Sequence, residues 1–593
     1  MSQPQPSGRG SSAHACLACR QSKVRCIYDP TDSPKCQRHV LRLILVPIVY
    51  VLEAPLTFFN QMYSIERFDK LEKQIDSLIN NIHSQRQNEN LLPTPTPPHD
   101  IPGSTLTVKD NHAHPVNYLK ADNSNPPVSL PVESVLPGHT VWPESQAAEA
   151  LCFVFRSELS IFFPFVTPPN KPVSVLRQSH PCLFKAMVVA ASYQNRALQI
   201  RRGAALTEEL AKRLLIDGEK TRDILQALLI TIAWYHGHLK RNPQMTNLLH
   251  LALAVLADLG FDKPAHLNDR RTVIFDASRS SYGFAEETNR MDNEDRRTLL
   301  GCFYVTSVAS AVFRRVDAIP YSRHLNQALQ ILVETGEHPA DELLVQHVRL
   351  QSLVEQIAQV APFDDPQGPH SSWAPTTMHI RYLEQQLTDL AQSATKFNTN
   401  CNWLIHVHAA RIFLYEAGLY DPLWQNANTS TGARQQRLDT MWKCLAATKS
   451  LFEVYISMPD HMIFTASYAL WGLLAYALLI ASRLCLSKVE GWDVDLVRTE
   501  LDFSQILELV AQKTDQGNAF ARVHWLGDGG SDEMVDRVTM KTRRVQTWFN
   551  QYFPRIFAQH DPALAMGPDP SFLLGIDDMF WEELITGFQP AGL

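Results

Sequence analysis

The N-terminal part of the sequence lacks a signal-peptide core and an apolar run of membrane-spanning length, and the sequence lacks the motifs of the common enzyme classes. Residues 1–8 have no apolar signal-peptide core. The apolar run 43–52 is interrupted by Pro47 and is shorter than the roughly 20 residues of a membrane span. There is no Walker-type glycine loop, dinucleotide fingerprint, Gly-x-Ser-x-Gly elbow or His-Glu-x-x-His. We therefore predict neither an enzyme nor a membrane partner.

Cysteine is scarce over most of the chain, and none occurs between Cys36 and Cys152. The later cysteines stand singly in apolar surroundings, which is typical of buried free thiols and indicates a reducing compartment. They are Cys152, Cys182, Cys302, Cys401, Cys444 and Cys485.

Charge is also sparse, at 19% of residues, whereas 45% are hydrophobic. This composition is typical of a globular protein. The net charge of -7 is unevenly distributed, because residues 1–42 contain seven Lys or Arg against two Asp. That N-terminal segment therefore carries +5 and the rest of the chain -12. A basic head on an acidic body favours contact with a polyanion at one end only.

The four remaining cysteines lie close together near the N-terminus, at Cys16, Cys19, Cys26 and Cys36. Two cysteines separated by two residues can both bind one tetrahedral zinc ion through their thiolates. Arg20, Lys23 and Arg25 lie among them. Because these cations would repel the metal, they should face outward, toward an external anion such as DNA phosphate or the acceptor edge of guanine.

The stretch 15–26, Ala-Cys-Leu-Ala-Cys-Arg-Gln-Ser-Lys-Val-Arg-Cys, resembles the first half of the fungal binuclear zinc cluster. In that family six cysteines hold two zinc ions. The resemblance implies that the four cysteines are zinc ligands and that Lys23 contacts a CGG half-site in double-stranded DNA. The DNA-binding residues that we predict are Arg20, Lys23, Arg25, Lys35 and Arg38.

The second half of the head (residues 1–62) departs from this family pattern. His39 stands where a fifth cysteine is expected, the sixth is absent, and an apolar segment follows within residues 39–63. One hypothesis is that this segment is translated from a retained intron or a wrong exon boundary. A second is a genuine one-zinc cluster with His39 as an optional ligand, and a third is that metal binding has been lost.

Residues 64–90 predict a short coiled coil. Apolar residues recur at alternating spacings of three and four, at Phe68, Leu71, Ile75, Leu78 and Ile82. Following a zinc cluster, such a helix suits a homodimer that reads two half-sites. The alternative is an amphipathic helix that packs on its own chain.

Residues 91–137 contain ten prolines among polar residues and predict an extended linker. Residues 138–555 show helical periodicity without sustained strand alternation, so we predict a mainly α protein with a large all-helical regulatory domain. Gly260 should cap one of its helices. The predicted helices are 145–163, 183–196, 224–236, 246–259, 293–312, 340–361, 376–396, 400–417, 432–457, 463–486, 495–514 and 535–551.

Three stretches of this domain, 228–236, 249–260 and 296–304, resemble the middle homology region of fungal zinc-cluster regulators. The resemblance implies a regulatory domain, which in some members of the family receives a small-molecule inducer.

The C-terminal segment 556–593 ends in an acidic and aromatic stretch. Residues 569–593 contain five Asp or Glu and no Lys, Arg or His. This pattern is typical of an activation segment that binds a coactivator groove, and the alternative is a helix that docks on the body. The residues that we predict to carry activation are Asp577, Asp578, Phe580, Trp581 and Leu584.

Together these features predict a nuclear, zinc-dependent, sequence-specific DNA-binding regulator of RNA polymerase II genes. Its target would be a pathway-specific gene set, such as one for secondary metabolism or nutrient use. The alternative is an interaction or ligand-sensing protein that no longer binds DNA because its cluster is incomplete.

Overall fold

A computed structural model describes residues 141–235, 244–264, 291–313, 316–359, 373–424, 431–526 and 532–557. All described residues lie within one compact unit, His112–Leu593. The predicted head, coiled coil and linker lie outside the described residues, as does the predicted C-terminal segment beyond residue 557.

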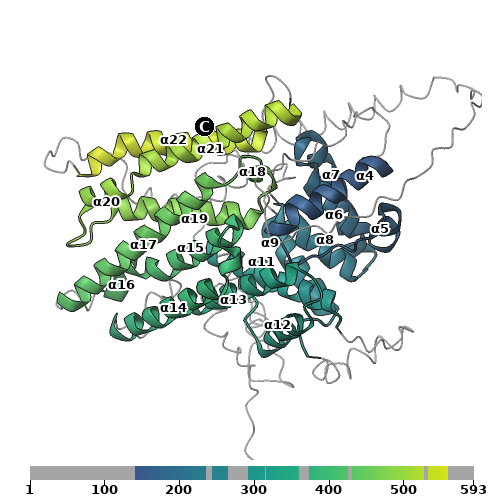
Figure 1. Ribbon diagram of the computed structural model, residues 1–593, viewed down its shortest axis with the longest axis horizontal. Helices are drawn as coiled ribbons and strands as arrows, with labels where there is room; N and C mark the ends of the chain where they lie inside the picture. The colour runs from purple at the N-terminus through teal and green to yellow at the C-terminus, as the bar shows by residue number, and fades with distance from the viewer. Residues whose placement is uncertain are drawn as a thin grey trace, which may run out of the picture. The chain divides into compact units, whose positions relative to one another are not determined.

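The regular structure of the described residues is helical, with no strand among them (Figure 1). This confirms the helical class predicted for this part of the chain. The first group of helices is α4 (Ser145–Val154), α5 (Val173–Ser179), α6 (Pro181–Ala191), α7 (Arg196–Ala211), α8 (Arg222–Ala233), α9 (Met245–Asp258), α11 (Asn293–Phe313) and α12 (Arg323–Thr335). The second is α13 (Ala340–Ala358), α14 (Trp373–Ser393), α15 (Cys401–Tyr415), α16 (Asp421–Trp424), α17 (Thr431–Ser457), α18 (Met462–Thr465), α19 (Tyr468–Leu486), α20 (Val494–Glu500), α21 (Phe503–Ala521) and α22 (Glu533–Phe557).

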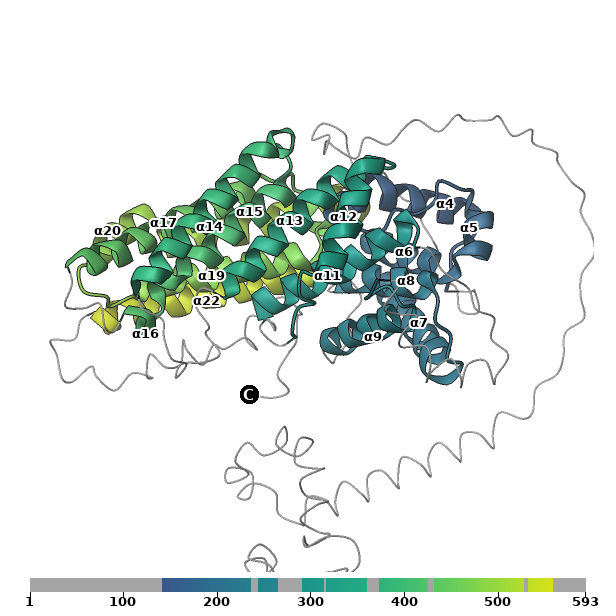
Figure 2. The same ribbon diagram turned by 90° about the horizontal axis from the view of Figure 1, so that it is seen from below.

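Helix α11 belongs to the first group of helices and also packs against the second. Both views show α4–α9 gathered at one end of the domain and α14–α17 with α20 at the other (Figures 1 and 2). In the first group α8 packs on α6 and α9, and in the second α15 packs on α13, α17 and α19. Helix α11 contacts α8 and α9 as well as α13 and α19, so it connects the two groups. The described parts of the stretches 228–236, 249–260 and 296–304 thus lie on, or directly after, helices that pack on one another.

Helix α19 lies in the core of the second group. Among the described helices it is the one that is long and apolar enough to cross a membrane, yet 83% of its apolar window is buried inside the domain. Its neighbours include α11, α15 and α17. The surrounding helices therefore supply the apolar environment that its sequence requires.

Three segments that we predicted as single continuous helices are each divided between two helices in the structure. The segment 183–196 breaks because the Asn195 side chain caps α7, accepting a hydrogen bond from the Leu198 N–H at 3.1 Å. The segment 495–514 breaks in the same way at Asp502, which accepts from the Gln505 N–H at 3.0 Å. The segment 463–486 divides into α18 and α19 across extended backbone at residues 466–467.

Gly260 ends α9 as predicted. Its φ of 72° lies in the left-handed region, which glycine adopts without steric cost. The Gly260 N–H donates to the carbonyl of Ala257 at 3.1 Å, and the Phe261 N–H donates to that of Leu256 at 3.2 Å. This pair of bonds is the Schellman arrangement, which satisfies carbonyls left open at the end of the helix.

Helices α5, α7, α12 and the short α16 were not predicted. Helix α12 nevertheless has clear signals at both ends, because Ser322 accepts from the Leu325 N–H and Gly336 has a φ of 52°. Its buried residues, Leu325, Ala328, Leu329 and Leu332, recur at helical spacing.

Candidate functional site

The predicted metal, DNA-binding, dimerisation and activation residues all lie outside the described residues. They are Cys16, Cys19, Cys26, Cys36 and His39; Arg20, Lys23, Arg25, Lys35 and Arg38; Phe68, Leu71, Ile75, Leu78 and Ile82; and Asp577, Asp578, Phe580, Trp581 and Leu584. Within the described ranges, no group of three or more His, Cys, Asp or Glu could hold a metal ion. The zinc site therefore stays a prediction for the head.

The cysteines of the helical domain are free thiols, as predicted. Cys401 is partly buried, and the others described are buried. Burial raises the pKa of Cys152 to about 11 and that of Cys182 to about 12. These thiols are thus protonated at neutral pH, and a protonated thiol is a poor nucleophile or metal ligand.

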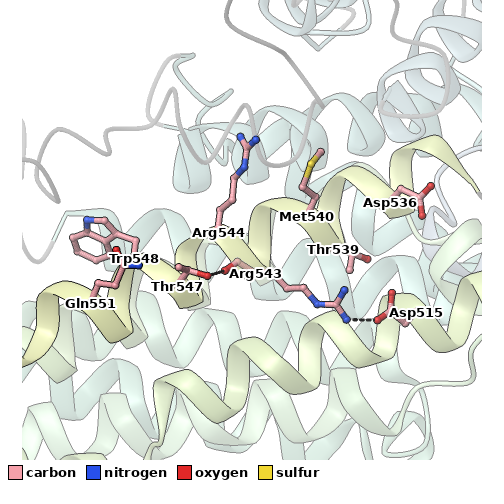
Figure 3. A pocket seen from close by; sticks show the side chains of 9 residues that line it. All are labelled: Asp515, Asp536, Thr539, Met540, Arg543, Arg544, Thr547, Trp548 and Gln551. Atoms are coloured by element: carbon pink, nitrogen blue, oxygen red, sulfur yellow. Dashed lines mark hydrogen bonds and ion pairs between the residues drawn. The ribbon is translucent and has the colours of Figure 1, made fainter. Parts of the chain in front are cut away.

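An open groove runs along α22 beside α21 (Figure 3). It has a volume of about 630 Å³. Figure 3 shows Arg543 directed toward Asp515 of α21, whereas Met540 and Arg544 point away from α21. The lining residues are Asp515, Asp536, Thr539, Met540, Arg543, Arg544, Thr547, Trp548 and Gln551.

The amphipathic sequence of α22 explains why this face is open. Val535, Val538, Val545 and Phe549 are buried and recur at spacings that place them on one side of the helix. Phe549 packs against Phe503 of α21 with ring centroids 4.9 Å apart. Most α22 residues that line the groove lie on the other side of the helix. Thr539 is the exception, because it is buried and its hydroxyl lies 2.5 Å from that of Thr514 of α21.

Some charged side chains of the groove have hydrogen-bond or ion-pair partners, and one has none among the described residues. Arg543 donates to Asp515 at 2.5 Å, and both side chains are about half exposed. Asp536 accepts from the Asn518 amide at 2.7 Å. Arg544 is exposed and has no hydrogen-bond or ion-pair partner among the described residues. The groove thus presents one uncompensated guanidinium.

Apolar surface lies beside this arginine. The Met540 side chain is 47% exposed, and Trp548 is only partly buried. A cation next to an exposed methionine and a partly buried indole suits an acidic, aromatic partner rather than a small polar substrate. Binding is therefore the chemistry that this groove supports.

A second polar cluster lies in the core, where α11, α13 and α15 meet. The Tyr304 hydroxyl lies 2.8 Å from His406 Nε2, and His406 Nδ1 lies 2.7 Å from the Asn402 carbonyl. Because a carbonyl only accepts, His406 Nδ1 carries the proton and Tyr304 donates to Nε2. Asn402 Nδ2 also lies 3.4 Å from Nε2 of His347. All four side chains are at most 2% exposed.

Burial keeps the two imidazoles of this core cluster neutral. It lowers the pKa of His406 to about 4. Burial is the larger of two causes that hold the pKa of His347 well below its usual range, and the electrostatic effect of the nearby His406 is the smaller one. His347 Nδ1 and Asn402 Oδ1 have no hydrogen-bond partner, which is costly in a core. We assign the cluster to the structure of the core.

Sequence reasoning did not identify either the groove or the core cluster. The signal for the groove was present as Arg and Lys residues on an amphipathic helix predicted at 535–551. The cluster joins residues about 50 to 100 positions apart in the chain, so no local pattern marks it.

Comparison with known proteins gives several relatives. The chain is 27% identical over 462 residues to "Transcription factor opdL" of Penicillium oxalicum, a match that covers 76% of this chain and 79% of that protein. It is 24% identical over 556 residues to "Transcription factor himD" of Aspergillus japonicus, covering 91% and 84%. It is 22% identical over 552 residues to a "Transcription factor" of Aspergillus terreus, covering 85% and 82%.

No family model matches the chain, and no solved structure matches it. Over most of its length, the chain is therefore similar to fungal proteins named as transcription factors.

Proposed function

We propose that this protein is a nuclear, sequence-specific DNA-binding regulator of RNA polymerase II genes. The observation that carries the proposal is the similarity to named transcription factors over most of the chain. The N-terminal pattern Cys16-x2-Cys19-x6-Cys26 supports it independently, because that spacing suits zinc and encloses outward-facing cations.

In this proposal zinc folds the head. The ligands are Cys16, Cys19, Cys26 and Cys36, with His39 as an optional fifth. Thiolate sulfur and imidazole nitrogen are the donors that zinc prefers. Metal binding to such a small segment supplies much of its folding free energy, so DNA binding depends on the metal.

The basic residues of the head have two roles in DNA binding, since some contact bases and others contact phosphates. Lys23 reads guanine acceptors in a CGG-type half-site, whereas Arg20 and Arg25 contact phosphates and fix the register. Lys35 and Arg38 add to the phosphate contacts. The seam from Phe68 to Ile82 makes a homodimer, which sets the spacing between two half-sites.

The acidic tail recruits coactivators, and the helical domain regulates that recruitment. Asp577 and Asp578 keep Phe580, Trp581 and Leu584 solvated until they bind a coactivator groove. Deleting residues 569–593 should abolish reporter activation while leaving DNA binding unchanged. Unchanged reporter output would refute the activation role.

The controlled genes form a pathway-specific set, such as one for secondary metabolism or nutrient use, and a small molecule is the inducer.

Selection from a random duplex pool with the full-length chain tests the main proposal. Enrichment of CGG triplets at a fixed spacing is the expected result. A folded protein that enriches no sequence would favour the second candidate, an interaction or ligand-sensing regulator without DNA binding. The absence of the fifth and sixth cluster cysteines specifically favours that candidate.

A further inference from the structure

We propose that the groove on α21 and α22 is the docking site of the chain's own acidic tail, residues 569–593. Docking would withhold the tail from other partners. The docking itself stands apart from the proposed function, whereas its regulatory consequence rests on that function.

Charge is the first argument. From Arg537 to Phe557 the α22 sequence contains five basic residues and no acidic one. The tail contains five acids and no basic residue. Because Arg543 and Arg544 are both exposed on the groove face, an acidic segment that lies there gains charge-assisted hydrogen bonds.

The two acids of the groove do not cancel this attraction. Asp515 is paired with Arg543. Asp536 keeps its negative charge when it accepts from the neutral Asn518 amide, but it lies at the end of the groove beyond Met540, away from Arg544 (Figure 3). Arg544 remains without a partner among the described residues. The ion pair of Arg543 with Asp515 is solvent-exposed, and exposed pairs contribute little free energy, so a tail carboxylate can share the Arg543 guanidinium at small cost.

Apolar complementarity is the second argument. The Met540 side chain is 47% exposed beside the two arginines of the groove, and Trp548 is partly buried at the end of the groove near Gln551 (Figure 3). The tail places Phe580, Trp581 and Leu584 beside its acids. A groove of about 630 Å³ holds a few side chains of a short amphipathic segment, which is a common mode of peptide recognition.

Chain length is the third argument. Eleven residues separate Phe557, the end of α22, from Asp569, and an extended segment of that length spans up to about 40 Å. Met540 and Gln551 lie about 17 Å apart along a helix axis. Pro562, Gly567 and Pro568 supply turn residues for a chain reversal. The tail can therefore reach the groove of its own chain at a high effective concentration.

Photo-crosslinking in the full-length protein tests the docking. A photoreactive amino acid replaces Trp581, and mass spectrometry locates the crosslinked peptides. We expect the main crosslinks on α22 between Met540 and Gln551. The charge reversal R543E/R544E should lower their yield at least tenfold, and combining it with D577R/D578R should restore the yield.

The matched control is R201E/K212E, which reverses two exposed charges outside the groove, at positions 201 and 212. This variant should leave the crosslinks unchanged. M540E serves as a second groove variant, with thermal melting to confirm its fold. Crosslinks that map elsewhere, or that survive both groove variants, would overturn the proposal.

Mixing light and heavy isotope-labelled chains separates docking within one chain from docking between copies. Crosslinks only between peptides of the same label support the proposal, and mixed-label crosslinks would contradict it.

If random-pool selection finds no DNA sequence but the crosslinks form, the docking stands and the proposed function fails. If both hold, R543E/R544E should raise reporter output at least twofold, because the tail is released.

Discussion

Arg297 of α11 holds Asp341 of α13 through two parallel hydrogen bonds, of 2.7 Å from Nε and 2.9 Å from Nη2. Both side chains are only 4% exposed. Asp341 also accepts from the His338 N–H at 3.1 Å, and Glu337 contacts Arg297 at 3.0 Å. This network ties α11, which contacts both groups of helices, to α13.

Removing one partner of this pair should strongly destabilise the domain. R297M or D341N leaves the other group buried without its counterpart, which costs about 3–5 kcal/mol. The double variant R297M/D341L should recover most of this loss, because apolar groups replace both charges. Urea denaturation measures the change. The exposed pair of Arg434 and Glu490 supplies the control, since R434A should change stability by at most about 1 kcal/mol.

Stability should fall as the pH drops from about 6.5 to 4, in part because of His406. Its pKa is about 4 in the folded protein and about 6.5 in the unfolded chain. Between these values the unfolded state binds a proton that the native state does not bind. The free energy of unfolding therefore falls by about 1.4 kcal/mol per pH unit for this residue, and above pH 6.5 the effect disappears.

The variant H406Q should remove this share of the pH dependence. Urea denaturation at several pH values between 4 and 7 gives the slope for each protein. H250Q, at an exposed position on α9, should keep the slope of the wild-type chain. Equal slopes for H406Q and the wild type would contradict the assignment.

Gly517 allows α21 to approach Ile463 of α18 closely. A Cβ at this position would lie 1.9 Å from Ile463 Cδ1. G517A should therefore destabilise the domain by about 1–3 kcal/mol through overpacking. Adding I463V removes Cδ1, so the double variant should be more stable than G517A alone in thermal melting. Additive losses from the two substitutions would mean that this contact is not the cause.

Two substitutions in the predicted head should affect DNA binding differently. K23A should cost about 1–3 kcal/mol on a CGG duplex and relax specificity. R20A should weaken binding to all duplexes similarly and flatten the salt dependence. Titration of full-length variants against CGG and scrambled duplexes at several salt concentrations distinguishes them. Equal losses on both duplexes for K23A would refute its role in base recognition.

The sequence predicted the helical class and most long helices, because their apolar residues recur at helical spacing. The prediction failed where one helix ends and the next begins within a continuous apolar pattern, as at Asn195 and Asp502. A polar residue in such a pattern can lie on the exposed side of one long helix or cap the start of a second helix, and the spacing does not distinguish the two. Gly260 was predicted correctly because a glycine after an apolar stripe is a local signal.

The features that depend on tertiary packing could not be predicted. Tyr304, His347 and His406 meet only because α11, α13 and α15 pack together. The groove likewise requires α22 to lie against α21 with its basic face outward. Local spacing carries no information on which helices become neighbours.

Zinc content measured together with DNA binding tests the central proposal most directly. The full-length protein is analysed for bound zinc and titrated against a CGG-containing duplex with and without a chelator. Zinc bound to each chain, with binding to the duplex that the chelator abolishes and added zinc restores, is the predicted result. A folded chain that holds no zinc and does not bind the duplex would contradict the proposal and favour a regulator that does not contact DNA.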